Sequence, residues 1–268
     1  MGKRYPALDV RADSPDLLLA LVDDYGPTAI EERGAAVRVF FPSPADRDAA
    51  QRALADRFDL ASIDVPDEDW ARRSQESLGP ITVGRITVFP NPKSRIPNPD
   101  TLAIVIAPSM GFGTGHHATT RLCLAALQRI ALEGRSVLDV GTGSGILAIA
   151  AVRLGAARAV GMDNDADAIQ SARENLALNR DTDRVTFDVA DFTAAAPPHA
   201  DVVTANLTGA LLVRSALRLL DACRPGGILV LSGVLAEERD TVVRAFAPAH
   251  IVWESEEDGW VGLAVKRS

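Results

Sequence analysis

Apolar and polar residues alternate along the second half of the chain in blocks that are typical of a parallel α/β sheet. Short apolar runs predict strands over 136–140, 157–162, 184–189, 201–205 and 227–231. The segments between and around them favour helices near 119–131, 145–154, 165–178, 208–222 and 235–246. Such alternation predicts a doubly wound sheet with helices on both faces.

The last part of the chain has a different pattern. Residues 250–253 and 260–265 are two apolar strands separated by an acidic turn, with no helical segment between them. Adjacent strands joined by a short turn pair antiparallel. We therefore expect an antiparallel hairpin to close an otherwise parallel sheet.

The first 66 residues predict a small, separate α/β unit. Strands are expected over 7–10, 28–32, 35–41 and 60–65. One helix should follow the N-cap pair Ser14-Pro15, and a second should begin at Pro44. The order βαββαβ is that of the ferredoxin-like split βαβ plan.

Residues 67–107 are expected to link this unit to a larger domain over 108–268. The segment 67–78 is polar and permits a helix, and 81–89 alternates apolar and polar residues as a half-buried β-ribbon does. The proline-rich stretch 90–99 predicts a loop, and 102–107 predicts a further strand. The expected domains are therefore 1–66, 67–107 and 108–268.

Composition narrows the classes of protein. With 268 residues, 47% of them apolar, the chain can bury a substantial core, and its net charge of −8 suits a basic partner better than nucleic acid. No apolar run approaches the roughly 18 residues of a membrane span, and the first residues lack the apolar core of a signal peptide. Cys123 and Cys223 lie far apart without metal-ligand spacing. We expect a cytoplasmic protein without membrane, metal or direct nucleic-acid contact.

The residues that carry chemistry follow the strand at 136–140. Asp139 precedes three alternating glycines, Gly141, Gly143 and Gly145, which let a ligand lie directly on the backbone. The pattern D-x-G-x-G-x-G differs from the G-x-G-x-x-G of dinucleotide enzymes, because the third glycine comes one residue early. Asp163 ends the next strand about 20 residues further on, as a ribose-binding carboxylate should. A dinucleotide site and a plain helix-packing turn are the alternatives.

The loop, the second carboxylate and the terminal hairpin together resemble class I S-adenosylmethionine-dependent methyltransferases. Residues 110–120 read M-G-F-G-T-G-H-H-A-T-T. They resemble the F-G-T-G-x-H-x-T-T element of the bacterial methyltransferases that modify large-subunit ribosomal protein eleven. Residues 69–70, 80–85, 203–207 and 231–237 resemble further segments of that family, and 1–66 correspond to its substrate-recognition domain.

This resemblance implies a fold, a cofactor and a reaction. The fold is a seven-stranded class I methyltransferase sheet with a small N-terminal ferredoxin-like domain. The cofactor is S-adenosyl-L-methionine, and the methyl group goes to lysine or other amino groups of a basic ribosomal protein. The three glycines would admit the methionyl part of the cofactor, and Asp139 would orient their loop or meet the ammonium group. Asp163 would accept the ribose hydroxyls, Asp191 the adenine amino group, and Thr120 would also contact the cofactor. The alternatives are a surface turn acid for Asp191 and a plain helix cap for Thr120.

Four further residues are considered for roles that the resemblance suggests. Phe112 and Thr114 are expected to form a lid over the cofactor. Asn206 ends the fourth strand, beside the sulfonium methyl group in this fold, and is expected to contact the cofactor. Its amide carbonyl can also accept a hydrogen bond from the acceptor amine, which makes it the expected catalytic residue. His117 either contacts a ligand or satisfies the loop backbone.

Departures from the family keep other acceptors open. Asn206-Leu207-Thr208 stands where Asn-Ile-Leu is common, and Ser74 stands where tryptophan is common. One alternative is a methyltransferase acting on another protein's lysine or on a small molecule. Another is a non-catalytic cofactor-binding module, against which the intact Gly141, Asp163 and Asn206 argue. The sequence does not indicate an oligomeric state.

Overall fold

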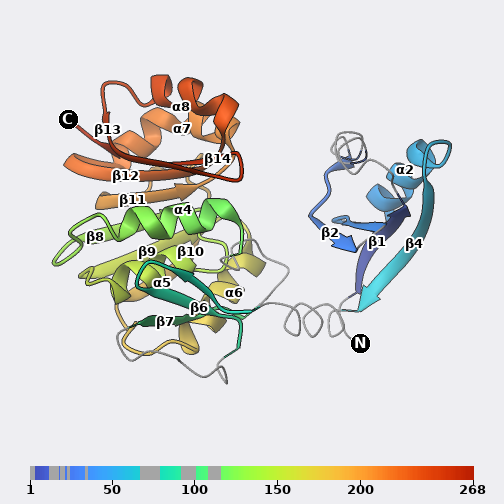
Figure 1. Cartoon of the computed structure of the whole chain (residues 1–268), viewed down its shortest axis with the longest axis horizontal. Helices are drawn as coiled ribbons and strands as arrows, with labels where there is room; N and C mark the ends of the chain where they lie inside the picture. The colour runs from blue at the N-terminus through green and yellow to red at the C-terminus, as the bar shows by residue number, and fades with distance from the viewer. Residues whose placement is uncertain are drawn as a thin grey trace. The chain divides into compact units, whose positions relative to one another are not determined.

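The chain forms two compact units, Met1–Ser77 and Leu78–Ser268. The computed structural model describes residues 4–11, 18, 22, 25–33, 36–66, 79–91, 101–107 and 116–268. Figure 1 shows the small unit in blue and the large unit in green to red. No helix within these described ranges is long and apolar enough to cross a membrane.

The small unit contains a four-stranded antiparallel sheet in the order β2-β3-β1-β4. Its strands are β1 (Arg4–Arg11), β2 (Ala29–Arg33), β3 (Ala36–Phe40) and β4 (Asp59–Pro66). Helix α2 (Pro44–Leu54) begins at N-cap Ser43, whose hydroxyl accepts a hydrogen bond from Asp46 N. This strand order is that of a split βαβ unit. Between Arg11 and Tyr25 only Leu18 and Val22 are described, both buried, so the full ferredoxin-like plan stays a prediction.

The large unit is built on a seven-stranded sheet in the order β10-β9-β8-β11-β12-β14-β13. Its strands are β8 (Ser136–Val140), β9 (Arg158–Asp163), β10 (Val185–Val189), β11 (Ala200–Asn206), β12 (Cys223–Leu235), β13 (His250–Glu257) and β14 (Trp260–Lys266). Strands β8 to β12 pair in parallel, whereas β14 pairs antiparallel with β12 and β13. The predicted doubly wound sheet with a terminal antiparallel hairpin is therefore confirmed (Figure 1).

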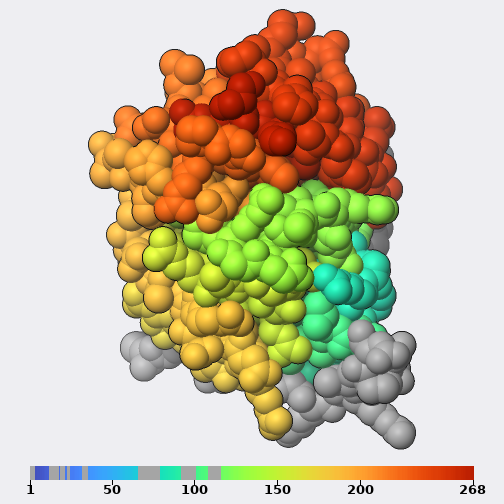
Figure 2. Space-filling view, turned by 90° about the vertical axis from the view of Figure 1, so that its left-hand side faces the viewer, coloured from blue at the N-terminus to red at the C-terminus, as the bar shows by residue number. Residues whose placement is uncertain are grey.

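Helices cover both faces of this sheet. One face packs against α4 (Ala118–Leu127), α5 (Ile146–Arg153) and α6 (Ala166–Ala177). The other packs against α7 (Gly209–Ala222) and α8 (Arg239–Ala245), which follows the short helix η2 (Ala236–Glu238). Helix α4 contacts the terminal hairpin, and Figure 2 shows α4 (green) beside these C-terminal residues (red).

Residues 81–89 and 102–105 form a three-stranded ribbon that belongs to the large unit. The ribbon consists of β5 (Ile81–Val83), β6 (Ile86–Phe89) and β7 (Leu102–Val105). Gln128 holds the β5–β6 turn by accepting from Arg85 N and donating to Val83 O, each at 2.9 Å. Asn179 of the segment after α6 bonds both backbone groups of Val105, at 2.9 and 2.8 Å. We expected the ribbon in a linker over 67–107, but these contacts and its apolar side chains attach it to the larger core.

Candidate functional site

The candidate site lies at the carboxyl edge of the sheet, between β8 and β11. From β8 the chain continues to β9 and β10 on one side, whereas β11 and β12 lie on the other, so the strand order reverses here. Ligands of open α/β sheets bind in the crevice at such a switch point. The strands pair at Val140 and Ala205, so Gly141 and Asn206 follow side by side. The fold thus brings the glycine loop next to the expected catalytic amide.

The glycine loop has a backbone that other residues adopt only with strain. Gly141, Gly143 and Gly145 have φ values of 68°, 50° and 83°. A Cβ on Gly141 would lie 2.6 Å from Leu207 Cδ2, and one on Gly145 would lie 2.6 Å from Phe187 Cζ. The third glycine therefore serves close packing at the start of α5, and contact of the loop with the methionyl group stays a prediction.

Asp163 ends β9 and is held at the rim of the loop by backbone groups. Its Oδ2 accepts a hydrogen bond from Gly143 N at 3.0 Å, and its Oδ1 accepts from Asp165 N at 3.1 Å. The side chain is half-buried. Each carboxylate oxygen has two acceptor positions, so the group can still accept hydroxyl donors such as those of a ribose.

The substitution Asp163→Asn should weaken cofactor binding and leave the fold intact. The amide presents a donor where the carboxylate only accepts, and losing a hydrogen bond to a charged group costs about 1.5–3 kcal/mol. Titration calorimetry with S-adenosylhomocysteine measures the change. Asp165→Asn is the matched control, because this exposed residue caps α6 through Asp167 N and asparagine caps equally well. Equal affinity of wild type and Asp163→Asn would rule out the ribose role.

Asp139 is enclosed in the protein beneath the loop. Its side chain is 1% exposed, and its Oδ2 and Oδ1 accept hydrogen bonds from Thr142 Oγ1 at 2.6 Å and Thr204 Oγ1 at 2.5 Å. Burial raises the pKa of this carboxyl from 3.8 to about 6 despite these donors. Of the two expected roles, these contacts are those of a residue that orients the loop, and contact with the ammonium stays a prediction.

Folding stability should depend on pH through Asp139. Because its pKa is raised on folding, the folded state binds the proton more tightly, and stability falls as pH rises from about 4 to about 6. At 1.36 kcal/mol per pKa unit the loss is about 3 kcal/mol. Asp139→Asn lacks this titration, so the variant should gain stability relative to wild type over that window. Urea unfolding at pH 4, 5, 6 and 7 measures it, and a constant difference across the window contradicts the expected titration.

Thr142 and Thr204 belong to the candidate site, although neither was predicted from the sequence. The signal for Thr204 was present, since it is a hydroxyl within the apolar strand residues 202–205. A polar group buried in such a strand requires a partner. That partner, Asp139, lies on the neighbouring strand and only the fold reveals it.

Thr120 carries a buried hydroxyl that fits a ligand contact. It lies in the first turn of α4, and its side chain is 1% exposed. Its Oγ1 has no hydrogen-bond partner among the described residues. Buried hydroxyls are normally paired, so this atom suits the cofactor contact that the sequence predicts.

The other expected cofactor residues remain predictions. Asp191 Oδ1 accepts hydrogen bonds from Thr193 N at 2.7 Å and Thr193 Oγ1 at 2.6 Å, contacts typical of an exposed turn. These bonds hold the pKa of its carboxyl below its usual value. Phe112 and Thr114, the expected lid, lie outside the described residues.

His117 caps α4 and packs against the terminal hairpin. Its Nδ1 accepts a hydrogen bond from Thr119 N at 3.3 Å, and its ring meets Trp260 edge to face with centroids 5.0 Å apart. Burial, followed by the nearby Arg121, lowers its pKa. The side chain thus satisfies backbone at the start of α4, as one of its two expected roles requires, and its contact with a ligand stays a prediction.

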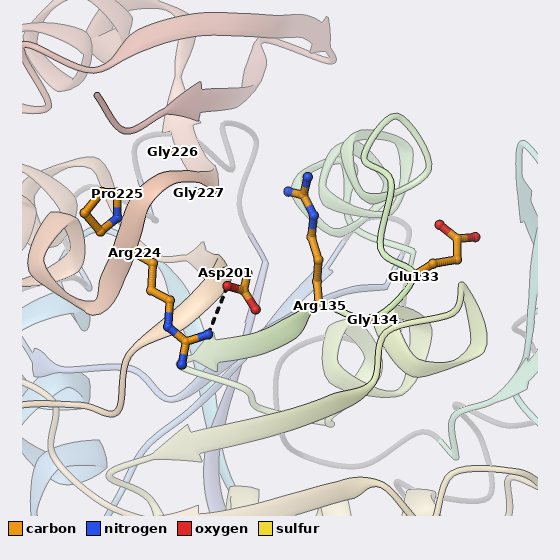
Figure 3. Close-up of a pocket in the computed structure, with 8 residues that line it drawn as sticks. All are labelled: Glu133, Gly134, Arg135, Asp201, Arg224, Pro225, Gly226 and Gly227. Carbon is orange, nitrogen blue, oxygen red and sulfur yellow. Dashed lines mark hydrogen bonds and ion pairs between the residues drawn. The ribbon is translucent and has the colours of Figure 1, made fainter.

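A hollow of about 380 Å³ lies at the opposite, amino edge of the sheet (Figure 3). It is lined by Glu133, Gly134, Arg135, Asp201, Arg224, Pro225, Gly226 and Gly227. Arg224 donates to Asp201 Oδ1 at 2.9 Å, and Ser136 N donates to Asp201 Oδ2 at 2.8 Å. The Asp201 pKa falls to about 2 because of its bonds to Ser136 and Arg224. The interactions of Asp201 link β8, β11 and β12 at this edge. The hollow is lined by none of the expected site residues.

The seven-stranded sheet, its terminal hairpin and the glycine loop at its switch point define a class I S-adenosylmethionine-dependent methyltransferase. Residues 25–268 match the model of a family described as Ribosomal protein L11 methyltransferase (PrmA). The chain belongs to this family.

Individual relatives agree with this membership. A ribosomal protein L11 methyltransferase from Pelobacter propionicus is 43% identical over 213 residues, covering 76% of this chain and 68% of that protein. One from Geobacter metallireducens is 47% identical over 182 residues, covering 67% of this chain and 59% of that protein. The crystal structure of a ribosomal protein L11 methylase from Lactobacillus delbrueckii subsp. bulgaricus superposes with a TM-score of 0.65 at 28% identity, covering 71% of this chain and 98% of that one.

Proposed function

We propose that this chain transfers a methyl group from S-adenosylmethionine to amino groups of ribosomal protein L11 in the cytoplasm. The observation that carries the proposal is the glycine loop placed beside Asn206 at the switch point of a sheet from this family. The names of the relatives support the acceptor protein. The Thr120 hydroxyl, which bonds no other described residue, and the Asp163 carboxylate beside the loop support the cofactor.

The chemistry needs alignment more than an added base. Bound S-adenosylmethionine supplies an electrophilic methyl group on a sulfonium. Asn206 is half-buried, and its amide makes no hydrogen bond with another described residue, so its carbonyl is available to an amine. Holding the amine there directs its lone pair along the transfer axis, which is catalysis by proximity and orientation.

The acceptor must also lose a proton. Neutralising a lysine of pKa about 10.4 at pH 7 costs roughly 4–5 kcal/mol. Asp139 is unsuited as the base, because its side chain is 1% exposed and both oxygens accept hydrogen bonds. Desolvation in a closed site and the adjacent positive charge both favour the neutral amine, and they offset part of this cost.

The small unit is the part we propose to bind the protein substrate. Residues 1–66 contain 12 acidic and 8 basic residues, a balance that favours a basic ribosomal protein. None of the expected cofactor residues lies in that unit. A different acceptor protein or a small molecule is the second candidate, because Leu207 and Thr208 depart from the family pattern beside Asn206.

The test is isotope transfer to purified ribosomal proteins, read by mass spectrometry. We expect label from S-adenosylmethionine on L11, and none when S-adenosylhomocysteine is in excess. Label found only on other proteins would show that the acceptor is a protein other than L11 and that the chain still transfers methyl groups. Cofactor binding without any transfer would favour a non-catalytic binding module.

A further inference from the structure

A buried polar layer lies directly beneath the site, on the sheet face covered by α4. Strands β8, β11 and β12 each place an apolar residue on this face, within one core: Val137, Val202 and Val230. The next residues of these strands on the same face, two positions further along, are polar and buried: Asp139, Thr204 and Ser232, exposed by 1%, 0% and 0%. Side chains alternate along a strand, so the next step on this face brings Gly141 and Asn206.

Asp139 links the glycine loop to strand β11 within this layer. One carboxylate oxygen accepts from Thr142 in the glycine loop at 2.6 Å. The other accepts from Thr204 of β11 at 2.5 Å. One buried carboxylate therefore bridges the glycine loop and the strand that ends in Asn206.

We propose that Thr204 is a positioning residue for methyl transfer, which acts through Asp139 to hold the end of β11 against the cofactor loop. The inference rests on the proposed function, because it concerns the alignment of the acceptor by Asn206. Thr204 lies on the same face as Asn206, two residues before it, so its bond fixes the strand where the amide emerges. A displacement of about 1 Å in a reacting geometry can lower a rate about 100-fold.

The chain offers well-matched variants. Thr204→Val keeps the size of the side chain and removes the donor, whereas Thr204→Ser keeps the donor. Thr87→Val is the control, because Thr87 is a buried threonine of β6 whose hydroxyl bonds Thr82 at 2.9 Å, away from the site. We expect Thr204→Val to lower kcat at least 10-fold with S-adenosylhomocysteine affinity within threefold of wild type. Thr204→Ser should keep kcat near the wild-type value, and Thr87→Val should change neither kcat nor the affinity.

A measurement independent of the acceptor separates this inference from the proposed function. With saturating S-adenosylhomocysteine, hydrogen exchange at Leu207 N, which donates to Ser232 O at 3.0 Å, reports on the end of β11. Thr204→Val should raise this exchange several-fold, and Thr204→Ser should not. Unchanged exchange, an unchanged kcat, or parallel losses of kcat and affinity would each overturn the positioning role. If wild type labels no ribosomal protein, the proposed acceptor fails and the exchange result alone decides the role of Thr204.

Discussion

A chain that begins at Leu78 is expected to fold and bind S-adenosylmethionine but to transfer no methyl group to its protein substrate. The large unit contains the whole seven-stranded sheet and cores on both of its faces. A unit with its own core can fold alone. The glycine loop, Asp163 and Asn206 all lie in this part, whereas the proposed acidic substrate-binding unit is removed.

The experiment compares the truncated and full-length chains in calorimetry with S-adenosylhomocysteine and in methyl transfer to L11. The expected result is an affinity within a few-fold of the full-length chain, together with loss of transfer. Adding the separate unit Met1–Ser77 is the control, since an untethered unit should restore little activity. Full transfer by the truncated chain would show that the small unit does not select the substrate. Lost cofactor binding would show that the units depend on each other.

The strands of the large unit could be predicted because parallel strands buried on both faces read as continuous apolar runs. The run at 136–140 became β8 (Ser136–Val140), and the run at 157–162 became β9 (Arg158–Asp163). The expectation for 227–231 was too short, since β12 spans Cys223–Leu235. At the start of this strand Cys223 pairs with Ala200 of β11, and at its end Leu235 pairs with Trp260 of β14. Neighbouring strands, not local sequence, set those ends.

The ribbon could not be placed from sequence for a similar reason. Its period-two pattern correctly indicated strands, but its attachment depends on amide side chains far along the chain. Gln128 bonds Val83 across 45 positions, and Asn175 accepts from Ala107 N across 68. Asparagine and glutamine on a helix are usually solvent-facing, so nothing local distinguishes these anchors.

The candidate site was predictable where a residue's role constrains the backbone and less so where it depends on packing. Glycines with positive φ and a carboxylate at a strand end are visible in sequence because few residue types meet those demands. The bridge from Thr142 through Asp139 to Thr204 is different, because it joins residues 65 positions apart. Sequence identified Asp139 as part of the loop, and the fold added the partners that hold it.

Asn206→Ala is expected to lower kcat roughly 100-fold or more while cofactor affinity stays within a few-fold, because loss of orientation alone can cost this much. The residue ends β11 beside Gly141, and its side-chain amide makes no hydrogen bond with any other described residue. Removing its side chain therefore takes away the carbonyl that we propose aligns the acceptor, without breaking a described hydrogen bond. A loss in kcat at constant affinity is the signature of an interaction made in the transition state.

Single-turnover transfer at saturating S-adenosylmethionine measures the Asn206 effect, and calorimetry with S-adenosylhomocysteine measures affinity. Thr208→Ala is the matched control, since this exposed neighbour makes no side-chain cap to α7. Its kcat should stay within twofold of wild type. If Asn206→Ala keeps kcat within a few-fold, another group aligns the amine, and the amide at the end of β11 is not catalytic. If affinity falls with kcat, Asn206 holds the cofactor instead, and the alignment of the acceptor must come from elsewhere on this edge of the sheet.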